Sequence, residues 1–182
     1  MGERKNNVSG KNRLFLLLTK EDEYVTNFDK IIKLIGDGNK KICYVTITRP
    51  YEDTINELKN MDIDTSNLFF VDTLTSYYME HPPVDNCIFV DGPTDLTKMK
   101  NAIKTAINEE KCNAIIFDTI SKLMIYKGIS SIVRFTHELL SENGERKTKK
   151  MFLLQKNSDI EKEEHQRLIS DLSMFADEII DI

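Results

Sequence analysis

The strongest constraint on the fold is the alternation of two kinds of segment along the 182-residue chain. Longer segments with apolar residues at three- and four-residue steps predict helices near 24–35, 55–61, 96–107, 132–140 and 161–175. Strands that alternate with helices imply β-α-β units, so we expect a doubly wound, three-layer α/β domain with a mostly parallel sheet. Short apolar, β-rich runs predict the strands Leu14–Thr19, Lys41–Thr46, Leu68–Asp72, Cys87–Asp91, Ala114–Asp118, Met151–Gln155 and Glu178–Ile182.

The domain organisation follows from the absence of any composition shift along the sequence. We expect one domain over residues 13–182, preceded by a flexible polar tail at residues 1–12. Runs such as Ile115–Phe117 are apolar on both faces, which is typical of central strands that helices cover on each side. The longest loop-like stretch is Thr73–Asn86, and its Tyr77–Pro83 part is a candidate interaction surface because aromatic residues are enriched in interfaces.

Charge and cysteine content exclude several classes of function. The net charge of −5 does not favour nucleic acid as a partner, because phosphate binding requires clustered Lys and Arg. The widely spaced Cys43, Cys87 and Cys112 lack metal-ligand or redox spacing, which favours buried thiols in a reducing compartment. The longest apolar run near the N-terminus, Leu14–Leu18, is too short for a signal sequence or a membrane span. We therefore expect a cytoplasmic protein without a membrane span, a nucleic-acid partner or a bound metal.

Three predicted strands end on an aspartate: Asp72, Asp91 and Asp118. Ligands of open parallel sheets bind beyond the carboxyl ends of the strands, so these positions matter for function. One interpretation is a shared carboxylate site for a divalent cation, as in a metal-dependent enzyme. The interpretation we favour is that these residues cap helices or form turns, which is common for Asp after a strand.

The segment after the first strand does not match a phosphate-binding loop. Such a loop needs G-x-x-x-x-G-K-[ST], whose glycines let backbone N–H groups surround the phosphates. Residues 19–26 read Thr-Lys-Glu-Asp-Glu-Tyr-Val-Thr, without glycine and with three acidic side chains where a polyanion would bind. The sequence also lacks G-x-G-x-x-G, G-x-S-x-G and H-E-x-x-H, so we expect no catalytic residues.

Asn113–Tyr126 resembles the Walker B strand, and the turn that follows it, of KaiC-like ATPases of the RecA superfamily. Lys41–Pro50, an amphipathic helix and Asn67–Asp72 resemble their second strand, helix and third strand. Gly92–Thr97 is similar to a segment of archaeal members, and Phe175–Ile182 resembles their closing strand. The resemblance extends over nearly the whole chain from Arg13.

The resemblance implies a RecA/KaiC-type sheet, a P-loop NTPase-like fold without its P-loop. Asp118 matches the Walker B position, which in an intact member helps to hold Mg²⁺ through water. The family's catalytic glutamate follows the second strand, where this sequence has Thr48 and Arg49. Neither can act as a carboxylate base, so the resemblance implies an inactive ATPase homologue that needs no ATP or Mg²⁺ as cofactor.

Three functional hypotheses remain open from the sequence. The leading one is a non-catalytic RecA/KaiC-like module for regulation or signal transduction in an archaeal cell, with a protein partner or a homo-oligomer. The second is a nucleotide or small-ligand sensor without hydrolysis, whose cleft Lys20, Arg49 and Asp118 would line. The third is a metal-dependent enzyme that uses the strand-end aspartates.

Overall fold

The computed structural model describes residues 13–20, 28, 30–32, 34–35, 41–141, 148–156 and 162–182. In this part of the chain, seven strands form one sheet in the order β4-β3-β2-β5-β6-β1-β7, and all pairings are parallel. The strands are β1 (Arg13–Thr19), β2 (Ile42–Thr46), β3 (Leu68–Asp72), β4 (Cys87–Phe89), β5 (Ala114–Asp118), β6 (Lys149–Gln155) and β7 (Glu178–Asp181).

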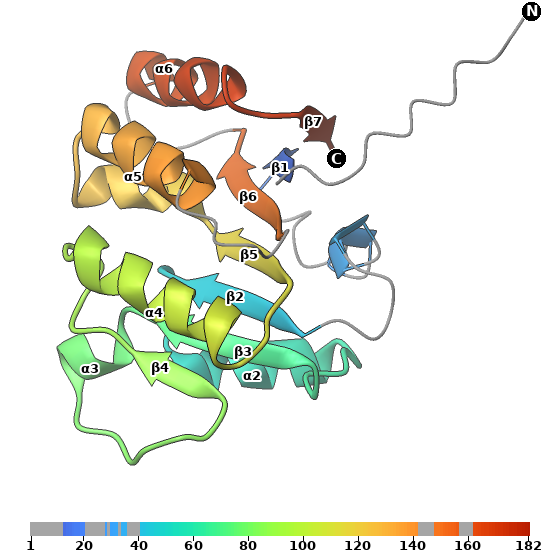
Figure 1. Ribbon diagram of the computed structural model, residues 1–182, viewed down its shortest axis with the longest axis vertical. Coiled ribbons are helices and arrows are strands. Elements are labelled where there is room, and N and C mark those ends of the chain that lie inside the picture. The colour runs from blue at the N-terminus through green and yellow to red at the C-terminus, as the bar shows by residue number, and fades with distance from the viewer. Residues whose placement is uncertain are drawn as a thin grey trace, which may run out of the picture.

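Helices cover both faces of this sheet. Figure 1 shows α4, α5 and α6 on one face, and α2 with the helical segment that contains Phe28 on the other. The expected doubly wound, three-layer α/β fold is confirmed. The helices are α2 (Tyr51–Asn60), α3 (Thr75–Tyr78), α4 (Leu96–Asn108), the 3-10 helix η1 (Ile120–Ile125), α5 (Ile129–Ser141) and α6 (Lys162–Ser173).

Each face of the sheet has its own apolar core. Side chains alternate along a strand, so on β1 Leu14 and Leu16 join one core while Phe15 and Leu17 join the other. The first core is completed by residues of α4, α5 and α6: Met99, Ile103, Ile132, Phe135, Leu168 and Leu172. The second is completed by Phe28, Ile31, Ile35 and Leu58. Burial on both faces explains why the central strands are almost continuously apolar.

The start of α4 and the end of β4 follow from local interactions of a few residues. Asp95 caps α4, because its Oδ1 accepts a hydrogen bond from the Lys98 backbone N–H at 2.9 Å. The strand predicted over Cys87–Asp91 is two residues too long. It ends at Phe89, because the chain then turns at Gly92, whose φ is +97° and whose N–H donates to the Val90 carbonyl at 2.7 Å.

The expected loop over Thr73–Asn86 contains a short helix, α3, so the loop prediction was wrong for Thr75–Tyr78. Asp72 explains where the helix begins, because its Oδ1 accepts from the backbone N–H groups of Leu74 at 2.6 Å and Thr75 at 3.0 Å. Four residues are too few to show helical periodicity, so the sequence pattern could not predict α3.

Three further expectations concern the cysteines, a membrane span and the N-terminal tail. All three cysteines are free and buried, and burial raises the pKa of the Cys112 thiol to about 12. None of the helices in the described residues combines the length and apolar character that crossing a bilayer requires. The expected tail at residues 1–12 lies outside the described residues.

Candidate functional site

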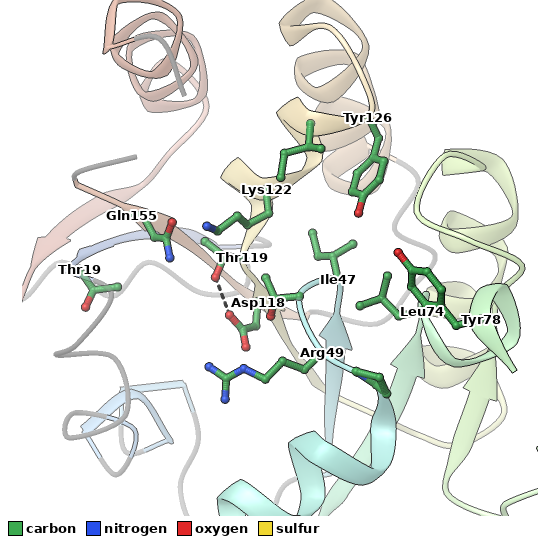
Figure 2. Close-up of a pocket in the computed structure, with 13 residues that line it drawn as sticks. Thr19, Ile47, Arg49, Leu74, Tyr78, Asp118, Thr119, Lys122, Tyr126 and Gln155 are labelled. Carbon is green, nitrogen blue, oxygen red and sulfur yellow. Dashed lines mark hydrogen bonds between the residues drawn. The ribbon is translucent and has the colours of Figure 1, made fainter. Parts of the chain in front are cut away.

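A pocket of about 480 Å³ opens at the carboxyl ends of the strands (Figure 2). It lies where β2 and β5 are neighbours, which is the point at which the strand order reverses and where ligands of such sheets bind. The described residues that line it are Thr19, Ile47, Thr48, Arg49, Pro50, Leu74, Tyr78, Asp118, Thr119, Lys122, Ile125, Tyr126 and Gln155.

Asp118 lies at the end of β5 and is 6% exposed. Its Oδ2 accepts a hydrogen bond from the Tyr44 hydroxyl at 2.5 Å, and its Oδ1 accepts one from the Thr119 hydroxyl at 2.5 Å (dashed in Figure 2). The Asp118–Thr119 peptide bond is cis. The Asp118 carbonyl also accepts from the Ile47 N–H at 3.1 Å, which joins the ends of β5 and β2. Both oxygens of the Asp118 side chain are therefore engaged by neutral donors.

The loop after β2 is held in place from several sides. The Thr46 hydroxyl donates to the Arg49 carbonyl at 2.7 Å, and the Thr73 hydroxyl donates to the Thr46 carbonyl at 3.0 Å. The Arg49 guanidinium forms an ion pair with Glu57 on α2. Arg49 thus lies in the pocket lining, but its charge is shared with a carboxylate of the next helix.

Asp72 and Asp91 do not join Asp118 in a common site. The carboxyl group of Asp72 is fully buried and accepts four hydrogen bonds, from the N–H groups of Tyr51, Leu74 and Thr75 and from the Thr75 hydroxyl. Asp91 is exposed and pairs with Lys98 at 2.8 Å, which lowers the pKa of Asp91 through a hydrogen bond and the lysine's charge.

The described residues accordingly contain no group of three His, Cys, Asp or Glu side chains that could hold a metal ion. Asp72, Asp91 and Asp118 all lie in the described residues and do not form the shared cation site of that hypothesis. The alternative interpretation holds for Asp72, which caps the start of both α2 and α3.

The polar side of the pocket contains two residues that the sequence did not single out, Lys122 and Gln155. Figure 2 shows the Lys122 side chain reaching from η1 toward Thr119 and Gln155. Gln155 ends β6, so the strand-end rule could have found it, whereas nothing in the sequence marks Lys122 on a 3-10 helix. Lys20, predicted to line the cleft, is exposed and is not among the described lining residues. The acidic residues of the predicted phosphate-repelling segment, 21–23, lie outside the described residues.

The other side of the pocket is apolar and aromatic. Figure 2 shows Tyr78 of α3 and Tyr126 after η1 with their hydroxyls directed toward each other, near Leu74 and Ile47. Burial raises the pKa of Tyr126, and the nearby hydroxyls of Tyr78 and Tyr77 raise it further. The pocket therefore combines one cationic, hydrogen-bonding wall with one apolar wall, a combination that suits an amphiphilic ligand.

Comparisons with known proteins give similarity of fold without similarity of sequence. No protein-family model and no curated protein matches the sequence. Among solved structures, a KaiC-like protein of the archaeon Pyrococcus horikoshii is 13% identical, with a TM-score of 0.57 over 87% of this chain and 68% of its own. An uncharacterized protein of the same organism, in complex with an unknown peptide, is 12% identical, with a TM-score of 0.61 over 94% and 77%.

A third similar structure is the flagellar accessory protein FlaH of Methanocaldococcus jannaschii. It is 10% identical, with a TM-score of 0.58 over 94% of this chain and 71% of its own. Identities this low establish architecture alone, because one fold can carry many functions. The chain has a RecA/KaiC-like fold.

Proposed function

We propose that this chain is a non-catalytic RecA/KaiC-like module that acts by binding another protein, in regulation or signal transduction. The observation that carries the proposal is the environment of Arg49. This residue stands where the family resemblance places a catalytic glutamate, and its guanidinium is ion-paired with Glu57. Phosphoryl transfer to water needs a residue that orients the attacking water, and a paired arginine cannot accept its proton.

The surroundings of Asp118 support the same proposal. Its oxygens accept hydrogen bonds from Tyr44 and Thr119 and form no contact with a cationic partner in the described chain. The sequence after β1 also lacks the glycines of a phosphate loop. Phosphoryl transfer depends on several parts acting together. Without a phosphate loop and a catalytic glutamate, Asp118 alone would contribute little to catalysis.

Binding to a protein partner is favoured by two observations. One structural neighbour was solved with a bound peptide, which shows that a protein of this fold can take one. On this chain, Tyr78 is exposed and lines the pocket, and its neighbours in sequence Tyr77 and Met79 are exposed too; aromatic residues and Met are enriched in interfaces. A second copy of the chain is an alternative partner of the same class.

ATP turnover tests the proposal. Purified full-length chain with ATP and Mg²⁺ should release phosphate no faster than the Asp118→Asn variant. Robust hydrolysis that Asp118→Asn abolishes would overturn the non-catalytic assignment.

A nucleotide or small-ligand sensor is the second candidate, and the composition of the pocket favours it. Lys122 and Arg49 place two cationic side chains in a cavity large enough for a small molecule. A ligand that binds only the folded chain raises its stability by about 2.7 kcal/mol at one hundred times its Kd. A nucleotide panel in a thermal-shift assay should then give a saturable rise in Tm with one member, and no rise with any member argues against the sensor.

A further inference from the structure

We propose that the pocket binds the base of a nucleoside through the side chain of Gln155 and makes no use of the phosphates of a nucleotide. Gln155 is the last residue of β6 and lies on the polar side of the pocket, where Figure 2 shows its side chain beside Thr119. This inference rests on the second candidate function, the small-ligand sensor, and specifies the chemistry of its ligand.

The Gln155 carboxamide is a buried polar group without a hydrogen-bond partner in the described part of the chain. The residue is 7% exposed, and its bonds to Ser121 and His165 are made by its backbone. A buried donor or acceptor without a partner costs about 1–3 kcal/mol. A buried amide in the wall of a cavity therefore indicates that a molecule inside the cavity supplies the missing hydrogen bonds.

The backbone of Gln155 is fixed by three neighbouring elements, so the carboxamide has a defined place in the pocket. Its N–H donates to the Ser121 hydroxyl of η1 at 3.4 Å, and its carbonyl is bonded to His165 Nε2 of α6. Its register partner on β1 is Thr19, whose carbonyl accepts from the Lys156 N–H at 2.8 Å. A group that is held before a ligand arrives loses little conformational entropy on binding, which favours affinity.

The shape of the carboxamide selects the kind of group that can satisfy it. A glutamine side chain presents a donor N–H and an acceptor oxygen side by side in one plane. A trans peptide bond cannot pair with both, because its N–H and C=O point in opposite directions. Ring amides and amidines present both on one edge, as when Asn or Gln binds adenine with two hydrogen bonds. Gln155 therefore favours a nucleobase over a peptide main chain.

The opposite wall of the pocket suits the remainder of a base. Apolar surface is contributed there by Ile47, Leu74 and Ile125, and Tyr78 and Tyr126 add their rings (Figure 2). An aromatic ring is polar at its substituted edge and apolar on its faces, so a base can meet the carboxamide and this wall at the same time. The cavity of about 480 Å³ lies within the range of small-molecule sites.

The basic residues of the lining do not select a phosphate group. Arg49 is ion-paired with Glu57, and Lys122 already has an interaction within the chain. The sequence after β1 also lacks the glycines that surround phosphates in a phosphate loop. Removal of the phosphates from a nucleotide should therefore cost little affinity, which distinguishes this site from one that holds a nucleoside triphosphate by its phosphates.

Isothermal titration of the full chain with adenosine, guanosine, cytidine and uridine, in the absence of Mg²⁺, tests the inference. We expect at least one nucleoside to bind saturably, and its triphosphate to have a Kd within about threefold of that value, because no free cation rewards the added charge. Absence of binding by all four nucleosides overturns the inference. Binding of triphosphates alone also overturns it, because phosphate would then be the group recognised.

A pair of glutamine variants locates the binding group. Gln155→Met removes the carboxamide but keeps the length of the side chain, and should weaken the nucleoside about tenfold or more, the scale of one bidentate pair. Gln166→Met makes the same chemical change at an exposed position of α6 and should leave the Kd unchanged. Melting curves check the fold of both variants. Equal Kd values for Gln155→Met and wild type contradict the inference.

The side-chain amide signals give a readout that needs no change at Gln155. Gln155 and Gln166 are the only glutamines in the sequence, so glutamine labelled with ¹⁵N in its side chain gives signals from these two amides alone. Gln166→Met assigns them. The nucleoside should shift the Gln155 signals and leave those of Gln166 in place, and unmoved Gln155 signals overturn the inference.

ATP turnover separates the two levels of proposal. Without turnover and without nucleoside binding, the inference fails while the non-catalytic assignment stands. Turnover that Asp118→Asn abolishes removes the non-catalytic assignment, whatever the nucleosides do.

Discussion

Asp72 and Asp118 end β3 and β5, the two strands that flank β2 in the sheet, yet their carboxyl groups have different roles. Both are register partners of Thr46 on β2, so they lie at the same level on either side of it. Asp72 is fully buried and accepts three backbone N–H groups and one hydroxyl. Asp118 accepts two side-chain hydroxyls and lines the pocket.

The difference shows how to separate a structural carboxyl group from a candidate binding group. Backbone N–H groups cannot turn away, so the four bonds of Asp72 fix the starts of α2 and α3 and leave little capacity for a ligand. Hydroxyls rotate, so Tyr44 and Thr119 can release Asp118 to a ligand in the pocket. The Asp-Thr pattern at each strand end is the same, and only the donors distinguish the two.

The largest expected effect on stability is that of Asp72→Ala, with Asp118→Ala as its comparison. Asp72→Ala leaves buried N–H groups of Tyr51, Leu74 and Thr75 without an acceptor, and should lower the free energy of unfolding by about 4 kcal/mol. Asp118→Ala leaves only two rotatable hydroxyls without an acceptor, so it should lower the free energy of unfolding by about 2 kcal/mol. Urea unfolding measures both, and equal losses would contradict the distinction.

Gly92→Ala tests the contact between Gly92 and the Tyr77 ring of α3. The residue has a φ of +97°, which alanine adopts only with strain, and its new Cβ would meet the Tyr77 ring. We expect the free energy of unfolding, measured with urea, to fall by about 2 kcal/mol, with displacement of the Tyr77 ring. Gly128→Ala is the matched control, because nothing lies within 4 Å of its Cβ position, and it should change stability little. Similar losses at both glycines would count against the Tyr77 contact.

Tyr44→Phe measures how much one of the two hydrogen bonds to Asp118 contributes to stability. The change removes the hydroxyl that donates to Asp118 Oδ2 but keeps the ring, which packs against Phe28 and Phe70. A loss of about 1 kcal/mol is expected, since Thr119 still donates to the carboxyl group. An unchanged denaturation midpoint would mean that this hydrogen bond contributes nothing to the fold.

The smallest effect is expected at a third strand end, where His165 Nε2 is hydrogen-bonded to the Gln155 carbonyl. Burial lowers the pKa of His165 below its ordinary 6.5, and the hydrogen bond to Gln155 partly offsets this. The unfolded chain therefore binds a proton more readily, so stability is complete above pH 6.5 and falls as the pH drops from 6.5 toward the lower folded pKa.

His165→Gln should remove that share of the pH dependence, a fraction of a kcal/mol. Urea unfolding of both proteins above pH 6.5 and about one unit below it measures the difference. Parallel pH profiles for wild type and variant would show that His165 does not titrate with folding.

The sequence predicted the architecture better than the site. Alternating periods predicted the sheet and its helices, because these depend on nearest neighbours along the chain. The sequence favoured a capping role for Asp72 but could not predict its donor Tyr51, which lies 21 positions earlier. Lys122 belongs to a 3-10 helix without an apolar stripe, and its place in the pocket depends on how the strands are ordered.

Phosphate release by the purified full chain with saturating ATP and Mg²⁺ tests the central claim most directly. The ion pair of Arg49 with Glu57 and the lack of glycines after β1 predict no release above the background without protein, in wild type and in Asp118→Asn alike. Sustained release by wild type that disappears in Asp118→Asn would contradict the claim and make Asp118 part of a working ATPase.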